Sequence, residues 1–203
     1  FNITSSGVSI TNLTIGKARD VGTKAGVYLR GVQNCTISNN VIIRNARGIY
    51  VTGGGYHNIS NNRIESNSGV GLYMYHSSHN TIANNSISNM ASDVNGIFLY
   101  KSDYNVLTGN NISCNHVGLY LYSGCEYNLV YNNYFRNRLY NALASGINIW
   151  NTTKTLGRNT VGGPYLGGNY WSDYNGTDID GDGLGDTPYT VAGLNVDYHP
   201  LTG

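Results

Sequence analysis

The chain has 203 residues, of which only 11% are charged, and its formal net charge at pH 7 is +1. Such a small charge, without a basic patch, excludes nucleic acid and anionic membrane surfaces as main partners. No apolar run approaches the roughly 18 residues of a membrane span, so none is expected. The 27 glycines and 18 tyrosines, together with regularly spaced apolar residues, indicate packed β structure rather than a low-complexity chain.

The strongest pattern is a phrase of glycine, an aliphatic residue, usually an aromatic residue and a second aliphatic residue. It occurs six times, and its glycines are separated by 22, 23, 25, 22 and 28 residues. A period of roughly 20 to 50 residues is typical of stacked repeats. The phrases begin at Gly26, Gly48, Gly71, Gly96, Gly118 and Gly146.

Between these phrases lies a second repeat built on asparagine pairs such as Asn39-Asn40 and Asn61-Asn62, flanked by short alternating runs. Asn, Gly and β-branched residues disfavour helices, whereas three-residue alternating runs are typical of short strands. Asn also tolerates left-handed corners and can hydrogen-bond the same residue of the next coil. The sequence therefore predicts an all-β, right-handed parallel β-helix of about seven coils over residues 1–160.

Alternation along each strand predicts which side chains face the solvent. In the phrase at Gly48, Ile49 and Val51 point inward, so Tyr50 points outward. Stacked over the coils, these positions predict a flat aromatic face, which either stabilises itself by ring contacts or binds a protein surface or a sugar. The predicted face consists of Tyr28, Tyr50, Tyr73, Tyr75, Phe98, Tyr100, Tyr120, Tyr122 and Trp150.

Residues 161–203 depart from the repeat and are expected to form an aromatic and calcium-loop cap over the open end of the solenoid. Carboxylates and a glycine recur at the spacing of a calcium loop, in which alternate residues aim oxygen atoms at a hard cation. The predicted ligands are Asp178, Asp180, Asp182, Leu184 (through its carbonyl) and Asp186.

The last ligand position of this loop carries Tyr189 instead of glutamate. Water, Asp173 or Asp197 is therefore expected to complete the shell of a structural calcium ion. The alternative is a solvated acidic loop, which mutual repulsion of the carboxylates opposes.

One group of polar residues is a candidate catalytic site. Counting back from Asn58, Asn80, Asn105 and Asn128 places Asp103 and Glu126 at equivalent positions of adjacent coils, about 5 Å apart. Such a pair suits a retaining glycosidase or a lyase. The same count aligns His57, His79, Tyr104 and Tyr127 in the next column, and Lys101 lies nearby. The alternative, which we favour, is an inert cluster of solvated turn residues.

Glycosylation sequons and cysteines are also spread along the chain. The cysteines Cys35, Cys114 and Cys125 match no metal-binding spacing, and a bridge between Cys114 and Cys125 remains open. The sequons modestly favour a secreted glycoprotein. They lie at Asn2, Asn12, Asn34, Asn58, Asn84, Asn111, Asn151 and Asn175.

The coil phrases, together with Gly168-Asn169-Tyr170-Trp171-Ser172-Asp173-Tyr174 and the acidic loop, resemble the NosD-like right-handed β-helix repeat family, and the ending is similar to modules of archaeal cell-surface proteins. The resemblance implies the fold and an extracellular setting. NosD itself is linked to copper, but no His/Met/Cys cluster in this sequence supports that role.

These observations favour a non-enzymatic role as an extracellular structural or adhesive protein of the cell surface or matrix, such as a filament or sheath subunit. The expected partners are other copies of the chain or cell-surface polysaccharide. The alternatives are a polysaccharide hydrolase or lyase that uses Asp103 and Glu126, and a non-catalytic carbohydrate-binding module.

Overall fold

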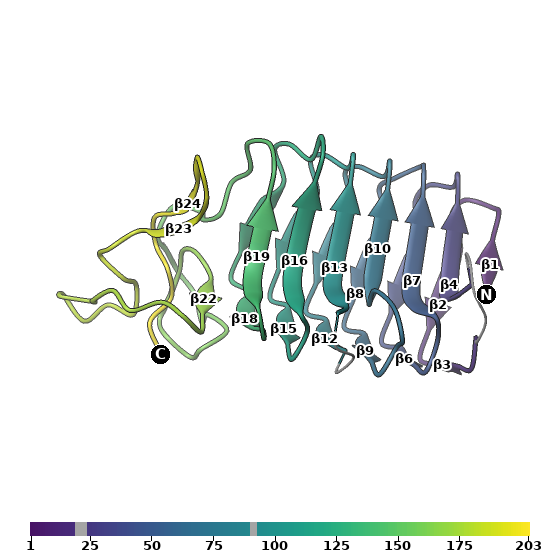
Figure 1. Cartoon of the computed structure of the whole chain (residues 1–203), viewed down its shortest axis with the longest axis horizontal. Helices are drawn as coiled ribbons and strands as arrows, with labels where there is room; N and C mark the ends of the chain where they lie inside the picture. Colours follow the sequence, from purple (N-terminus) through teal and green to yellow (C-terminus); the bar gives the residue numbers. More distant parts are fainter. Residues whose placement is uncertain (19–23, 90–92) are drawn as a thin grey trace.

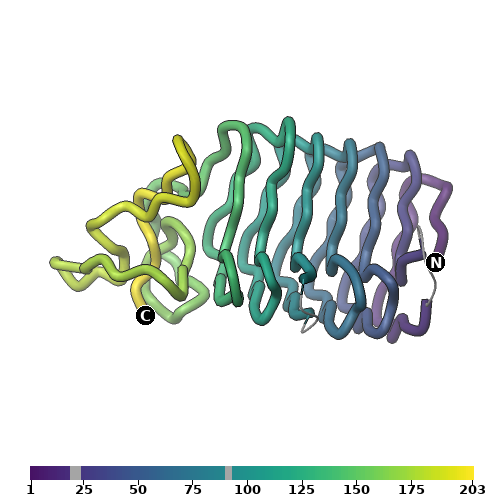
Figure 2. The backbone as a smooth tube through the Cα atoms, in the orientation of Figure 1, coloured from purple at the N-terminus to yellow at the C-terminus, as the bar shows by residue number. Residues whose placement is uncertain are grey.

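The computed structural model describes residues 1–18, 24–89 and 93–203, and these residues contain strands but no helix. Three parallel sheets run along the long axis, and the chain visits them in turn (Figure 1). The predicted parallel β-helix is therefore confirmed, with about six turns. Figure 2 shows the turns as regular rungs from the N-terminus to an irregular C-terminal end.

We call the three sheets A, B and C, in the order in which the chain visits them. Sheet A contains β1 (Asn2–Ile3), β4 (Ala25–Arg30), β7 (Arg47–Thr52), β10 (Leu72–Tyr75), β13 (Asn95–Tyr100), β16 (Val117–Tyr122) and β19 (Tyr140–Ala144). Sheet B contains β2 (Ser9–Thr11), β5 (Thr36–Ser38), β8 (Asn58–Ser60), β11 (Thr81–Ala83), β14 (Val106–Thr108) and β17 (Leu129–Tyr131). Sheet C contains β3 (Thr14–Gly16), β6 (Val41–Ile43), β9 (Arg63–Glu65), β12 (Ser86–Ser88), β15 (Asn111–Ser113), β18 (Tyr134–Arg136) and β22 (Tyr170–Trp171).

The register aligns equivalent residues of successive rungs. Tyr50 pairs with Tyr28 on one side and Tyr73 on the other, and the inward neighbours stack in the same way. The inward aliphatic columns are fully buried, and each such side chain contributes about 1.5–3 kcal/mol of hydrophobic stabilisation. The column in sheet C, for example, consists of Ile42, Ile64, Ile87, Ile112 and Phe135.

Each corner of the solenoid contains a buried asparagine ladder. At the corner between sheets B and C, each amide nitrogen donates to the side-chain oxygen of the next rung; the Asn85–Asn110 and Asn110–Asn133 bonds are 3.0 and 2.9 Å long. The backbone N–H also donates to that oxygen, so the ladder satisfies polar groups that a buried turn would leave unpaired. This ladder contains Asn40, Asn62, Asn85, Asn110, Asn133 and Asn169.

The repeated glycines have a specific cause, which is the ladder between sheets C and A. A Cβ atom at Gly96 would lie 2.8 Å from Asn115 Nδ2, and one at Gly118 would lie 2.3 Å from Asn137 Nδ2. No side chain fits beside the ladder at these positions. The period seen in the sequence is therefore the period of the buried asparagines.

The sixth phrase does not join sheet A, which corrects one sequence-based prediction. In β19, Leu143 rather than Asn148 pairs with Tyr120. The chain after Gly146 runs along sheet B, where Ile149 bridges Leu129. Trp150, predicted on the aromatic face, is instead fully buried and donates its indole N–H to Asn195 Oδ1 at 2.9 Å.

The C-terminal segment closes the end of the solenoid. It contains two antiparallel hairpins, β20 (Thr155–Leu156) with β21 (Tyr165–Leu166), and β23 (Tyr189–Ala192) with β24 (Asn195–Asp197). Trp171 of β22 stacks on Phe135 at a centroid distance of 4.7 Å and on Tyr189 at 4.5 Å. These rings cover the end of the core, which would otherwise be open to solvent.

Candidate functional site

The outer face of sheet A carries two columns of half-exposed aromatic rings. In the first aromatic column, ring centroids of successive rungs lie 4.9–5.3 Å apart, and the Tyr28, Tyr50 and Tyr73 rings are nearly parallel. Arg47 lies over the Tyr50 and Tyr73 rings at 5.1 and 5.5 Å. Burial, followed by the neighbouring phenols, raises the pKa of Tyr50. This column comprises Tyr28, Tyr50, Tyr73, Phe98 and Tyr120.

The second aromatic column comprises Tyr75, Tyr100 and Tyr122, with centroids 5.3 and 5.6 Å apart. Towards the C-terminal end the rings of the two columns tilt, and Tyr120 meets Tyr122 edge to face at 63°. Parallel rings hide one another's faces, so the N-terminal part of the surface offers ring edges and hydroxyl groups. The tilted C-terminal part also offers ring faces.

A third column, which the sequence analysis misassigned, lies at the corner between sheets A and B. The corner column consists of Tyr56, His79, Tyr104 and Tyr127, with centroids 5.1–5.3 Å apart and planes within 16°. The sequence count placed His57 in this column because it started from Asn58. In the structure, Asn58 pairs with Thr81, so Tyr56 takes that place and His57 occupies the buried ladder.

The two candidate catalytic carboxylates belong to adjacent rungs, as expected, and Asp103 takes part in the hydrogen bonds of the turn. Asp103 Oδ1 accepts a hydrogen bond from the backbone N–H of Glu126 at 2.9 Å, and the N–H of Asp103 donates to Ser78 Oγ at 3.0 Å. Asp103 is therefore hydrogen-bonded to the turns of both neighbouring rungs. Glu126 is exposed on an outer corner. Lys101 lies over the ring of Tyr100 at 5.4 Å, and His79 stacks in the corner column.

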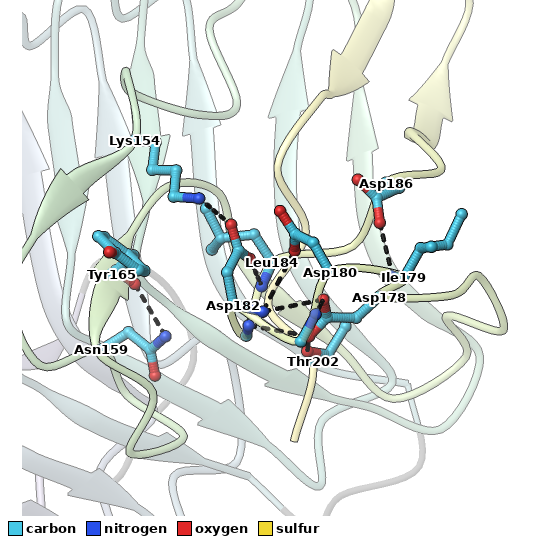
Figure 3. A network of polar contacts seen from close by, with 12 residues as sticks. Lys154, Asn159, Tyr165, Asp178, Ile179, Asp180, Asp182, Leu184, Asp186 and Thr202 are labelled. Carbon is cyan, nitrogen blue, oxygen red and sulfur yellow. Dashed lines mark hydrogen bonds and ion pairs between the residues drawn. The ribbon is translucent and has the colours of Figure 1, made fainter.

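The acidic loop gathers three of its predicted ligands. Ligand oxygens of Asp178, Asp180 and Asp186 all lie within 4.8 Å of one another. Asp182 is held elsewhere by an ion pair with Lys154, and its other oxygen accepts the N–H of Leu184 at 2.7 Å (Figure 3). The structure therefore brings together three carboxylates and leaves the Asp182 carboxylate outside the group.

Asp178 organises this loop. Its carboxylate accepts bonds from the N–H groups of Gly181 and Gly183, both at 2.8 Å, and from the Thr202 hydroxyl at 3.0 Å. Burial raises the pKa of Asp178, but these bonds outweigh that effect and hold it below its ordinary value. The lowered pKa keeps Asp178 ionised at neutral pH.

The two acids expected to complete the calcium shell are engaged elsewhere. Asp173 accepts bonds from Asn141 Nδ2 at 2.7 Å and from the Tyr189 hydroxyl at 3.0 Å. Asp197 is fully buried and accepts the indole N–H of Trp171 at 2.9 Å. Each aspartate ends one asparagine ladder, so both belong to the attachment of the cap rather than to the acidic loop.

The sequon asparagines are distinct from the ladder asparagines. All of them are exposed except Asn151, which is half-buried and accepts the N–H of Tyr198 at 3.1 Å. Cys35, Cys114 and Cys125 are free thiols, and burial raises the pKa of Cys125. The described residues contain no helix that is long and apolar enough to cross a membrane.

Fold and surface together define a parallel β-helix repeat protein with an aromatic exterior. The family profile described as "Periplasmic copper-binding protein (NosD)" matches residues 1–176. The chain belongs to this family, whose description supports a location outside the cytoplasm. A search of curated protein sequences finds no significant match.

Two solved structures are similar to part of the chain. A mutant of the periplasmic alginate epimerase AlgG is 20% identical with a TM-score of 0.48, covering 66% of this chain and 34% of its own. The A-module of the mannuronan C-5 epimerase AlgE4 from Azotobacter vinelandii is 11% identical with a TM-score of 0.39, covering 73% of this chain and 55% of its own. The chain thus spans about a third of the first protein and about half of the second.

The metal-ligating groups of the described residues do not fit copper. Within the described residues, only Asp178, Asp180 and Asp186 bring three metal-ligating side chains together, and all three are carboxylates. Copper selects imidazole and sulfur ligands, whereas carboxylates suit calcium. Cys35 and His57 are neighbours; His57 Nδ1 accepts the backbone N–H of Cys35 at 3.2 Å, and His57 Nε2 is buried without a hydrogen-bond partner but belongs to no group of three metal-ligating side chains.

Proposed function

We propose that this protein is an extracellular structural and adhesive β-helix of the cell surface or matrix, which contacts polysaccharide through its exposed aromatic columns. The observation that carries the proposal is the continuous run of rings across successive rungs of sheet A. A contiguous aromatic patch on a protein surface marks a binding site for another molecule. In its structural role, the protein would be a subunit of a filament or sheath.

The aromatic columns suit a polysaccharide because the protein and the polymer both present their binding groups at regular intervals. The columns present one ring per rung, at centroid spacings of 4.9–5.6 Å. A polysaccharide also repeats its hydroxyl groups and apolar C–H groups at regular intervals. Tyrosine serves both kinds of group, since its ring is apolar and its hydroxyl makes hydrogen bonds.

Retention on insoluble polysaccharides tests this proposal. The wild type is expected to be retained on cellulose, chitin or alginate beads, and the Tyr50→Val/Tyr73→Val/Tyr100→Val variant to lose most of that retention. Tyr134→Val is the matched control, because Tyr134 stacks on Tyr170 at 4.6 Å but lies on sheet C. Equal retention of all three proteins would contradict the proposal. Reducing-sugar release abolished by Asp103→Asn would instead identify a hydrolase.

We also propose that the acidic loop binds a structural calcium ion. Asp178, Asp180 and Asp186 supply carboxylates, and water completes the shell because Asp173 and Asp197 are engaged in the cap. The grouping of three carboxylates supports this proposal, since the ion would neutralise their mutual repulsion. The ion would fasten the loop to the C-terminal residues through Thr202, which donates a hydrogen bond to Asp178.

Calcium titration into metal-stripped protein tests the second proposal. At a concentration of 100 times Kd, a bound ion stabilises the fold by about 2.7 kcal/mol, which raises Tm by roughly 5–10 °C for a chain of this size. Asp180→Asn should abolish the shift, whereas Asp93→Asn, an exposed acid outside the loop, should leave it unchanged. An unchanged Tm of the wild type at millimolar calcium would count against the site.

A further inference from the structure

The corner column occupies an unusual backbone conformation. Tyr56, His79, Tyr104 and Tyr127 all have left-handed φ values, between 54° and 61°. For most residues with a Cβ atom, this conformation costs about 1–2 kcal/mol because the Cβ crowds the following carbonyl oxygen; Asn and Asp adopt it more easily. The same conformation occurs at Lys17, Arg44, Ser66 and Cys114 in the corner between sheets C and A, so what distinguishes the corner column is that its four side chains are all aromatic rings.

The same solenoid contains a matched reference for this column. At the corner between sheets B and C, the left-handed position is filled throughout by the residues that adopt it most easily. These residues are Asn12, Asn39, Asn61, Asn84, Gly109 and Asn132. In the corner between sheets A and B, the rung before Tyr56 also carries an asparagine, Asn34, with a φ of 55°. The fold therefore accepts asparagine at this corner, and the aromatic residues are not needed for the turn.

The rings also do not serve the core, because they project from an outer corner. Tyr56, Tyr104 and Tyr127 are 57%, 51% and 48% exposed. Ring stacking offsets part of the backbone strain, at about 0.5–1.5 kcal/mol per pair. What remains is a ridge of exposed ring edges with a phenol or imidazole at its crest. A contiguous set of exposed rings that the fold does not require is typical of a binding site.

The dimensions of the ridge restrict its partner. Four rungs at about 4.8 Å spacing give a ridge roughly 14 Å long and one side chain wide. A stable protein interface buries about 800 Å² on each partner, far more than a narrow convex ridge offers. A single polymer chain lying along the ridge needs no such area.

The charges beside the ridge restrict the partner further. The strip between the corner column and the second aromatic column contains Lys101 and His76, but also Asp103 and Glu126. The carboxylates would repel a polyanion, and the strip offers no excess of positive charge to attract one. This mixed strip fits an uncharged chain that is rich in hydroxyl groups.

We propose that the corner column binds a single chain of an uncharged polysaccharide, which lies parallel to the helix axis across successive rungs. The inference deepens the proposed function and rests on it, because it names the ligand and its path. Hydroxyl groups of the sugars pair with Tyr56, Tyr104 and Tyr127, and their apolar C–H groups contact the ring edges. Lys101 and Asp103 supply a donor and an acceptor beside this path.

The decisive variant is Tyr56→Asn/Tyr104→Asn/Tyr127→Asn, because asparagine suits the left-handed backbone and the variant should fold. We expect its Tm to lie within a few degrees of the wild-type Tm, since lost ring stacking is offset by relieved strain. Retention on cellulose or chitin should fall by about ten-fold or more. Retention equal to the wild type would overturn the proposal, as would a wild type retained on neither probe.

A second variant separates this inference from the proposed function. If polysaccharide binds the sheet A face alone, Tyr50→Val/Tyr73→Val/Tyr100→Val removes retention while the corner variant keeps it. The proposed function then stands and the corner column is excluded. Stronger retention on alginate than on cellulose or chitin also excludes an uncharged ligand at the corner. Retention on none of the three probes contradicts both proposals.

Discussion

The corner between sheets A and B and the corner between sheets B and C have the same left-handed backbone but different occupants. The corner between sheets B and C carries asparagine and glycine on its exposed side, whereas the corner between sheets A and B carries Asn34 and then tyrosine or histidine in the next four rungs. Because solenoid geometry is common to both corners, it does not account for the difference. In a repeat protein, the conformational energy of a residue at one corner can therefore be compared with that of the equivalent residue at another corner.

The inner sides of the two corners are alike, because both hold a buried ladder of amides. Asn105 donates to Asn128 Oδ1 at 2.9 Å in one, and Asn110 donates to Asn133 Oδ1 at 2.9 Å in the other. Stability therefore depends on the inner position at both corners, whereas the side chains at the outer position differ between the two corners. Substitutions at inner and outer positions should have very different effects.

The largest effect is expected for Asn110→Ala, at the inner position. Asn110 accepts the N–H and the amide of Asn85 at 2.9 and 3.0 Å and donates to Ile82 O at 2.8 Å, all within the core. Each buried group left unpaired costs about 1–3 kcal/mol, so we expect a loss of about 4 kcal/mol and a Tm lower by roughly 10 °C. Thermal unfolding measures this change.

The matched control for that substitution is the next residue along the chain. Asn111→Ala removes an exposed side chain on the outer face of β15. Its Tm should stay within about 2 °C of the wild type, as for most surface substitutions. Similar losses at both positions would show that the ladder has no special part in stability.

The next effect concerns Asp197, where the ladder between sheets B and C ends. Asn169 donates to this carboxylate from its N–H at 2.7 Å, and Trp171 from its indole at 2.9 Å. Burial nevertheless outweighs these bonds and raises the pKa of Asp197 to about 6. The unfolded chain releases this proton near pH 4, so folding takes up a proton between about pH 4 and pH 6.

This uptake predicts that the free energy of unfolding decreases as pH rises through that window, by about 3 kcal/mol from this group. Chemical denaturation at pH 4, 5, 6 and 7 measures the trend. Asp197→Asn should flatten it, whereas Asp93→Asn at an exposed site should not. A wild-type stability that rises steadily from pH 4 to pH 6, with the same slope in Asp197→Asn, would refute this assignment.

The fold followed from the sequence because every rung repeats the same short-range pattern. The period of the glycine phrases and the asparagine pairs determined strands, faces and the aromatic columns through Tyr120. Prediction failed where the repeat changes length. The sixth phrase, at Gly146, looks like the others but lies after β19, so Trp150 enters the core instead of the surface.

The corner column was misassigned for a related reason, since a shift of one residue exchanges inner and outer positions. His57 replaces asparagine in its ladder, and the neighbouring Asn58 misled the count. The repeat pattern of the sequence alone does not reveal such a replacement. The partners of Asp173, Asp182 and Asp197 were likewise hidden, because they depend on contacts between the cap and the solenoid that no local pattern encodes.

The smallest effect, and the most direct test of the comparison, comes from Asn61→Tyr, which places an aromatic residue at the exposed left-handed position between sheets B and C. Asn61 has a φ of 55°, close to the 54° of Tyr104. Its neighbours in the column, Asn39 and Asn84, offer no ring to stack upon, so the backbone strain of about 1–2 kcal/mol is not offset. Thermal unfolding should show a Tm lower by roughly 3–6 °C. Retention on cellulose should be unchanged, because this corner lies away from the corner column. If Asn61→Tyr leaves Tm unchanged, tyrosine is not strained in this conformation, and the aromatic corner needs no functional explanation.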